Sequence, residues 1–173
     1  QQAVKASPAW GIELLALIST RQELPSEVQT AVLWALRDAP VPLDDRLAFL
    51  ALVRGWNWPD DVTRPLASLL DGWSRNLEVG GNHPLLNALD EAADLVYERT
   101  EGMESGLLSE AGWTERAINH PAGHAATVWW MVANARNRAN GQFVLTIDDA
   151  ELKRWERVLD DKTLAGAHAR VIL

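Results

Sequence analysis

Two histidines four residues apart are the strongest candidates for chemistry in this sequence. On a helix, His120 and His124 would share one face, which is the spacing that zinc peptidases use to hold their metal. A proline, an alanine and a glycine separate them, so the glutamate that acts as general base in those enzymes is absent. The simpler interpretation is a helix start, in which Asn119 or His120 caps the helix and Gly123 permits close helix contact. We therefore predict no metal and no cofactor here, and name Asn119, His120 and His124 as binding candidates.

Four Asp-Asp pairs could suggest a second metal or hydrolase site. They are residues 44–45, 60–61, 148–149 and 160–161, and each lies near the predicted start of a helix. Carboxylates at that place accept hydrogen bonds from the first turn and suit the positive end of the helix dipole. We interpret the pairs as helix caps, because adjacent residues on a helix point in different directions.

Nine tryptophans are many for a chain of this length. Those expected inside helices should fill gaps between packed helices, and they are Trp10, Trp34, Trp73, Trp113, Trp129, Trp130 and Trp155. Trp56 and Trp58 lie in a connection, where loop aromatics beside a polar residue could anchor a partner. A staple onto the neighbouring helix is the interpretation we favour for both.

The spacing of apolar residues predicts an all-α fold of about nine helices with no sheet. The helices are expected near 10–18, 25–39, 43–54, 58–76, 84–101, 109–118, 121–140, 149–159 and 163–173. Pro65 should kink or restart the fourth of these, and 142–146 should be a loop. Residues 121–135 carry no charged side chain, so that helix should be the buried centre of its half. Short connections favour stacked helical hairpins, like an α-solenoid, in a single domain or solenoid segment over 1–173.

Composition excludes several classes of partner. The formal net charge of −8 argues against nucleic acid, whose binding depends on clustered Lys and Arg. No apolar run approaches the roughly 18 to 20 residues that a membrane-spanning helix needs. The absence of cysteine removes disulfides, thiolate zinc sites and thiol nucleophiles, and fits a cytoplasmic protein.

Both ends of the sequence favour a segment of a larger multidomain protein. Gln1 is no initiator, and the last three residues are apolar with no cap. Other domains of the same polypeptide are therefore the first partners to expect. The final helix carries Leu164, Ala167, Val171, Ile172 and Leu173, which predicts an open apolar edge and self-association through 164–173.

One stretch resembles a known group of proteins. Residues 117–123, followed by an apolar helix with tryptophans and then a charged helix over 149–159, resemble the helical region downstream of the sirtuin-like domain in large bacterial antiphage-defence proteins. The resemblance covers mainly 84–173. It implies a separate parent domain that hydrolyses NAD, while this region supports assembly or senses a protein trigger. Only Asn119, His120, Pro121 and Gly123 match, so no catalytic residue and no NAD site are carried over to this chain.

The leading hypothesis is a non-catalytic interaction, scaffold or sensor segment, because no acid–base or nucleophile constellation appears. Two alternatives stay open. One is a metal-dependent enzyme domain using His120 and His124 with a carboxylate distant in sequence. The other is a small-ligand site between helices, walled by tryptophans.

Overall fold

The computed structural model of this chain describes residues 2–21, 25–75, 77–79, 83–100, 112–139, 141 and 147–173, with the side chains of 18–21 left aside. These residues form ten helices and no strand, which confirms the predicted all-α fold. The helices are α1 (Gln2–Ala6), α2 (Pro8–Arg21), α3 (Ser26–Arg37), α4 (Leu43–Gly55), α5 (Asp60–Ser74), α6 (Pro84–Glu98), α7 (Trp113–Asn119), α8 (Pro121–Ala139), α9 (Asp149–Asp160) and α10 (Leu164–Ile172). The helix that the sequence did not predict is α1.

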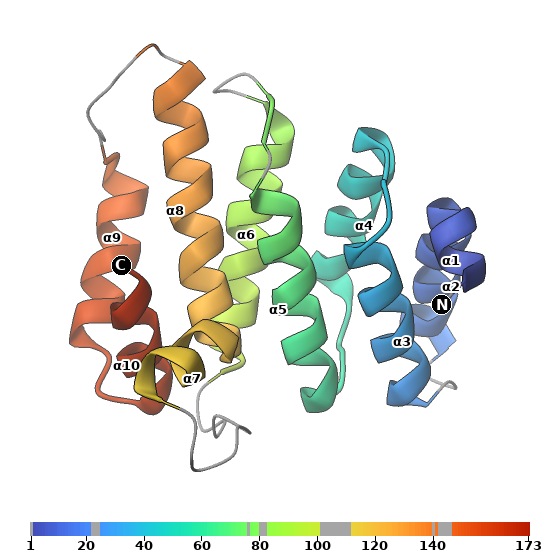
Figure 1. Ribbon diagram of the computed structural model, residues 1–173, viewed down its shortest axis with the longest axis horizontal. Coiled ribbons are helices and arrows are strands. Elements are labelled where there is room, and N and C mark those ends of the chain that lie inside the picture. The colour runs from blue at the N-terminus through green and yellow to red at the C-terminus, as the bar shows by residue number, and fades with distance from the viewer. Residues whose placement is uncertain are drawn as a thin grey trace.

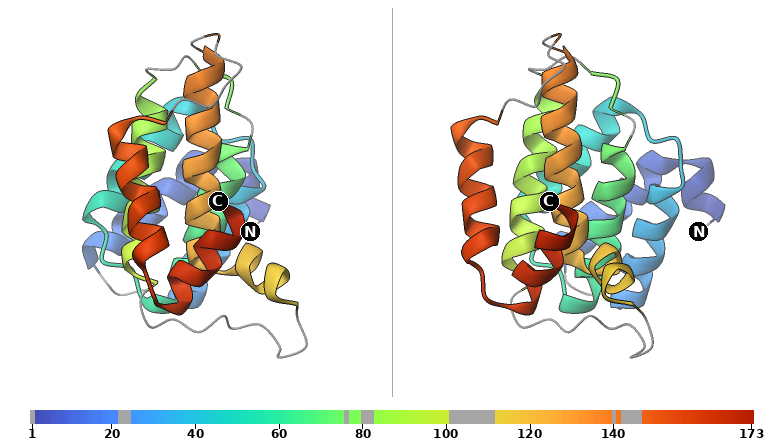
Figure 2. Two further views of the ribbon diagram at one scale, coloured as in Figure 1. Left: turned by 90° about the vertical axis from the view of Figure 1, so that its left-hand side faces the viewer. Right: turned by 60° about the vertical axis from the view of Figure 1, so that its left-hand side comes forward.

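The helices stand side by side in an elongated stack (Figure 1). In one row α1 packs on α3, α3 on α5, α5 on α8 and α8 on α10, while in the other α2 packs on α4 and α4 on α6. The small helix α7 lies across one end of α8 and contacts α10 (Figure 2). This arrangement places α2 and α9 at opposite ends of the stack.

The centre of the C-terminal half is α8, as its lack of charge predicted. Its small side chains Ala122, Ala125 and Ala126 are buried, which lets α5, α6 and α10 pack closely around it. Trp129 is also buried, and its ring lies against Tyr97 of α6 at a centroid distance of 5.3 Å. Further along the stack, Phe49 and Trp73 meet edge to face at 5.4 Å.

The internal proline of α5 and the caps of α9 and α10 can be compared with the sequence predictions. The helix α5 runs through Pro65 without restarting, and the buried Pro65 ring packs into the core. The helix α9 is capped by Asp148, which forms a capping box with Glu151. The sequence offers Asp161 or Thr163 as the cap of the last helix, and in the structure Thr163 caps α10 by accepting from the Gly166 N–H. The predicted loop over 142–146 and the predicted helix start at 109 lie outside the described residues.

Three of the four Asp-Asp pairs lie at helix starts as expected, whereas the pair 160–161 lies at the end of α9. Among the four pairs, only 148–149 supplies a side-chain cap at its helix start. Asp148 accepts a hydrogen bond from the Glu151 N–H at 2.8 Å. The pairs 44–45 and 60–61 fall in the first turns of α4 and α5, where their charge suits the dipole, and prolines occupy the cap positions. Asp161 instead accepts hydrogen bonds from Tyr97 and from the Thr163 N–H.

The last helix is only partly open to solvent. Leu164 and Val171 are each 38% exposed, whereas Ile172 and Leu173 pack against the core. The predicted open edge is thus present on one face of α10, and self-association through it stays a prediction. None of the described helices combines the length and apolar character that crossing a bilayer requires.

Candidate functional site

His120 lies between α7 and α8 and serves as a helix cap. Its Nδ1 atom accepts a hydrogen bond from the Ala122 N–H at 3.1 Å, which confirms the capping interpretation. His83 makes the same bond to the Leu85 N–H at 3.1 Å, at the start of α6. Both histidines belong to an Asn-His-Pro tripeptide that occurs twice, at 82–84 and 119–121. That repeated tripeptide was the sequence signal for a shared cap, and our sequence analysis missed it.

Gly123 allows α8 to lie against the end of α7. A Cβ atom at this position would stand 1.9 Å from the Ala117 carbonyl oxygen. The predicted role of Gly123 in close helix contact is therefore confirmed. The side chain of Asn119 turns the other way, because its amide donates to the Glu115 carbonyl within α7 at 2.9 Å.

Three aromatic rings stack where α7, α8 and α10 meet. His168 lies between His120 and Trp113, with centroid distances of 4.5 Å and 4.9 Å. The His168 side chain is fully buried, and neither of its ring nitrogens has a hydrogen-bond partner among the residues that the structure describes. Burial lowers its pKa, and the nearby Arg116 lowers it further. His168 therefore acts as a neutral, flat spacer between the helices, a role that sequence alone did not indicate.

His124 faces away from that stack and pairs with Asp71 of α5. Its Nδ1 atom lies 2.9 Å from Asp71 Oδ2, which also accepts from Arg75 at 2.8 Å. Burial raises the pKa of Asp71, but the hydrogen bonds from His124 and Arg75 outweigh it and hold that pKa below its ordinary value. Asp71 Oδ1 is buried and has no hydrogen-bond partner within the described ranges of the chain. The pair joins α5 to α8 below the surface, since His124 is 7% and Asp71 3% exposed.

The two candidate histidines do not converge on one point. His120 caps α8 and stacks on His168, whereas His124 binds Asp71. In the described part of the chain, no group of three or more His, Cys, Asp or Glu side chains is placed to hold a metal ion. The two side chains do not share one helix face, as their spacing had suggested, because His120 precedes α8 instead of belonging to it.

Trp56 and Trp58 staple the connection between α4 and α5 onto the core. Both rings are buried and meet edge to face at 6.0 Å. Trp58 Nε1 donates to Thr63 Oγ1, and the Arg99 guanidinium covers the Trp58 ring at 4.3 Å. The rings are used internally, so the alternative in which they anchor a partner is corrected in favour of the staple.

The remaining tryptophans divide between core and surface. Trp73 and Trp129 are buried as predicted, while Trp34, Trp130 and Trp155 are half-buried. Trp10 and Trp113 are 48% and 46% exposed, so the core prediction is wrong for these two. Trp10 belongs to α2, which packs on α1, α3 and α4 at one end of the stack. Trp113 stacks on His168, and the Arg116 guanidinium lies over its ring at 5.9 Å.

The helix α9 is attached to α6 and α8 through a polar seam. It buries just Glu151 and Val158. Arg154 of α9 binds Asp94 of α6 with two nitrogens, at 2.8 and 2.9 Å. Arg136 of α8 joins Asp90 at 2.7 Å and Glu151 at 3.1 Å. The side of α6 that carries Asp90 and Asp94 is therefore the docking face for α9.

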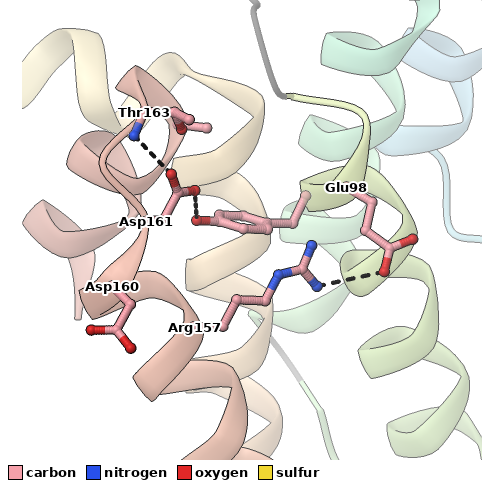
Figure 3. A pocket seen from close by; sticks show the side chains of 7 residues that line it. Glu98, Arg157, Asp160, Asp161 and Thr163 are labelled. Atoms are coloured by element: carbon pink, nitrogen blue, oxygen red, sulfur yellow. Dashed lines mark hydrogen bonds and ion pairs between the residues drawn. The ribbon is translucent and has the colours of Figure 1, made fainter.

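A pocket of about 370 Å³ opens at one end of this seam, between α6 and the turn from α9 to α10 (Figure 3). Asp161 accepts from the Tyr97 hydroxyl at 2.6 Å, and Arg157 pairs with Glu98 at 3.5 Å. Burial and the hydrogen bond to Asp161 raise the pKa of Tyr97, so its hydroxyl keeps its proton and donates it to that bond. Asp160 points away from this network (Figure 3). The polar groups of the pocket mostly bind one another, and no tryptophan lines it.

Asp90 carries an unusual pKa for a carboxyl with two arginines nearby. Burial raises this pKa to about 6, against the opposing effects of Arg154 and Arg136. We expect the free energy of unfolding to fall as pH rises from about 4 to 6, because over that interval the folded protein holds the Asp90 proton and the unfolded chain releases it. The contribution is on the order of 3 kcal/mol.

Replacement of Asp90 by Asn should remove this pH dependence, since the amide has no titrating proton and keeps an oxygen for Arg136. Urea unfolding of both proteins across that pH range measures the effect. Equal pH slopes for wild type and Asp90→Asn would show that Asp90 does not titrate in this interval.

Comparison with protein-family models, with curated proteins and with solved structures found no match to this chain. The resemblance to the helical region of antiphage-defence proteins consequently stays a prediction from the sequence.

Proposed function

We propose that this chain is a non-catalytic helical interaction segment that pairs with a second copy of itself through the outer face of α9. That face consists of Leu152, Lys153, Glu156, Leu159 and Asp160, all of them exposed. The main support for this proposal is the exposed fraction of its two leucines, which is 48% for Leu152 and 62% for Leu159. Leu159 is the most exposed large apolar side chain in the described part of the chain.

The spacing of these leucines favours a helix as the occupant. Leu152 and Leu159 are seven residues apart, so they form one ridge over two turns of α9. Adjacent helical hairpins in a stack bury such ridges against each other, and α9 stands at the end of the stack (Figure 1). An exposed ridge at that place supports contact with another helix.

The charges on the same face support a second copy as that helix. Lys153 and Asp160 are also seven residues apart, beside the leucine ridge. In an antiparallel pairing of two α9 helices, Leu152 of one copy meets Leu159 of the other, and Lys153 approaches Asp160. A two-fold contact of this kind needs a self-complementary face, which opposite charges at its two ends provide.

We expect weak, concentration-dependent dimers, with a dissociation constant on the order of 100 µM, because one helix pair buries less surface than a stable interface needs. Sedimentation velocity over a concentration series measures it. The Asp160→Lys variant should weaken the dimer by placing two lysines together, and adding Lys153→Asp should restore it. Both substitutions suit the dipole of α9, so the helix is retained.

Leu17 provides a matched control, since it is 47% exposed on α2 at the other end of the stack. Leu17→Ser should leave the dimer unchanged, whereas Leu159→Ser should abolish it. If Leu17→Ser also lost association, the two ends of the stack would meet head to tail, and the two-fold contact would be rejected. A monomer at all concentrations, or failure of the double charge exchange to restore the dimer, would reject the proposal.

A further inference from the structure

Arg46 is a half-buried arginine that pairs with none of the carboxylates in the described part of the chain. Its Nε atom donates to the Val41 carbonyl at 3.0 Å, and its guanidinium lies over the Trp73 ring at 5.5 Å. No ion pair joins Arg46 to any carboxylate that the structure describes, whereas the half-buried Arg136 and Arg154 each bind two. The terminal nitrogens of Arg46 therefore retain donor capacity in a partly dry environment.

A cavity of about 210 Å³ lies beside this guanidinium, where the start of α4, the segment 77–79 and the start of α6 meet. Apolar side chains form most of its wall, and the lining residues are Val41, Leu43, Arg46, Leu77, Glu78, Val79 and Leu85. Val41, Leu77 and Leu85 are buried, so this part of the wall is fixed by the core. A pocket with apolar walls and one charged group that fixes orientation is the usual form of a small-molecule site.

We propose that this cavity binds a small carboxylate with a short apolar tail. The carboxylate takes the terminal nitrogens of Arg46, in the two-pronged geometry that guanidinium and carboxylate share. The tail lies along Val41, Leu77 and Leu85. The volume matches roughly seven non-hydrogen atoms, judged by the space that water molecules occupy in the liquid.

Two features of the surroundings set the charge preference. Burial lowers the pKa of Arg46 because it disfavours the charged guanidinium, and an anion beside the guanidinium would remove that penalty. Glu78 stands at the rim with an exposed side chain and makes no ion pair with Arg46. Its negative charge weakens anion binding moderately without filling the site.

The test is titration of the full chain with pentanoate, which has seven non-hydrogen atoms, followed by nitrogen-edited NMR of the Arg46 Nε–H and the indole N–H signals. Saturable shifts are expected for pentanoate, and pentan-1-ol should bind at least about tenfold more weakly because it lacks the charge. Arg46→Gln should weaken binding about tenfold or more, and Arg46→Lys by less. Glu78→Gln should tighten it about threefold by removing a like charge.

Arg37 supplies a matched control for general electrostatic attraction. Its guanidinium also lies over a tryptophan, Trp34, at 5.4 Å, yet it does not line this cavity. Arg37→Gln should leave pentanoate binding unchanged. Absence of saturable shifts, equal binding of pentan-1-ol, or an Arg37→Gln effect as large as that of Arg46→Gln would overturn the proposal. Binding of a leucine-terminated peptide without binding of pentanoate would overturn it too.

Discussion

Replacement of Gly123 by Ala is expected to lower the free energy of unfolding by about 3 kcal/mol, the upper part of the range for overpacked sites. The new Cβ would stand 1.9 Å from the Ala117 carbonyl oxygen and 2.9 Å from its carbon. That carbonyl cannot turn aside freely, because it accepts a hydrogen bond from the His120 N–H and its residue is fully buried. Relief therefore requires α7 and α8 to separate, which also disturbs the stack of His120, His168 and Trp113.

The chain offers a control for the substitution itself. Gly55 ends α4, and a Cβ atom there meets nothing within 4 Å. Gly55→Ala should leave stability unchanged or raise it by up to about 1 kcal/mol, since alanine favours helix over glycine. Urea unfolding followed by circular dichroism compares both variants with wild type. If Gly123→Ala proved as stable as Gly55→Ala, the close contact between α7 and α8 at Gly123 would be contradicted.

The second large effect is expected from Asp71. Its replacement by Ala should cost about 3 kcal/mol, because breaking a buried pair leaves the other partner without compensation. His124 would lose its bond to Asp71 while staying buried between α5 and α8. Arg75 is half exposed and turns to water, so it adds little to the loss.

Asp71→Asn separates the charge from the hydrogen bond. The amide keeps an oxygen for His124, so we expect a smaller loss, about 1 kcal/mol. The pKa of Asp71 is lowered from 3.8 in the folded protein, so the stability that its charge contributes is present above that pH and is lost as pH falls below it. Unfolding at neutral and acidic pH measures this. A cost for Asp71→Ala no larger than that for Asp71→Asn would indicate that the pair with His124 contributes little.

The local features of this protein follow from its sequence. Apolar residues recurring at helical spacing predicted the helices, and the uncharged run at 121–135 predicted the buried position of α8. Helix starts were also readable, since a cap bonds to a backbone N–H just two or three residues away. The caps of His120 and Thr163 were therefore within reach of sequence reasoning.

The contacts between helices were decided by the tertiary structure. His124 of α8 contacts Asp71, which belongs to the much earlier helix α5. His168 reaches His120 only because α10 packs on α7 and α8. Helical periodicity shows which face of a helix is apolar, but not which other helix covers it. The same limit applies to the carboxylates of α6. They dock α9 because Arg154 lies within hydrogen-bond distance of Asp94, a contact that only the tertiary structure shows.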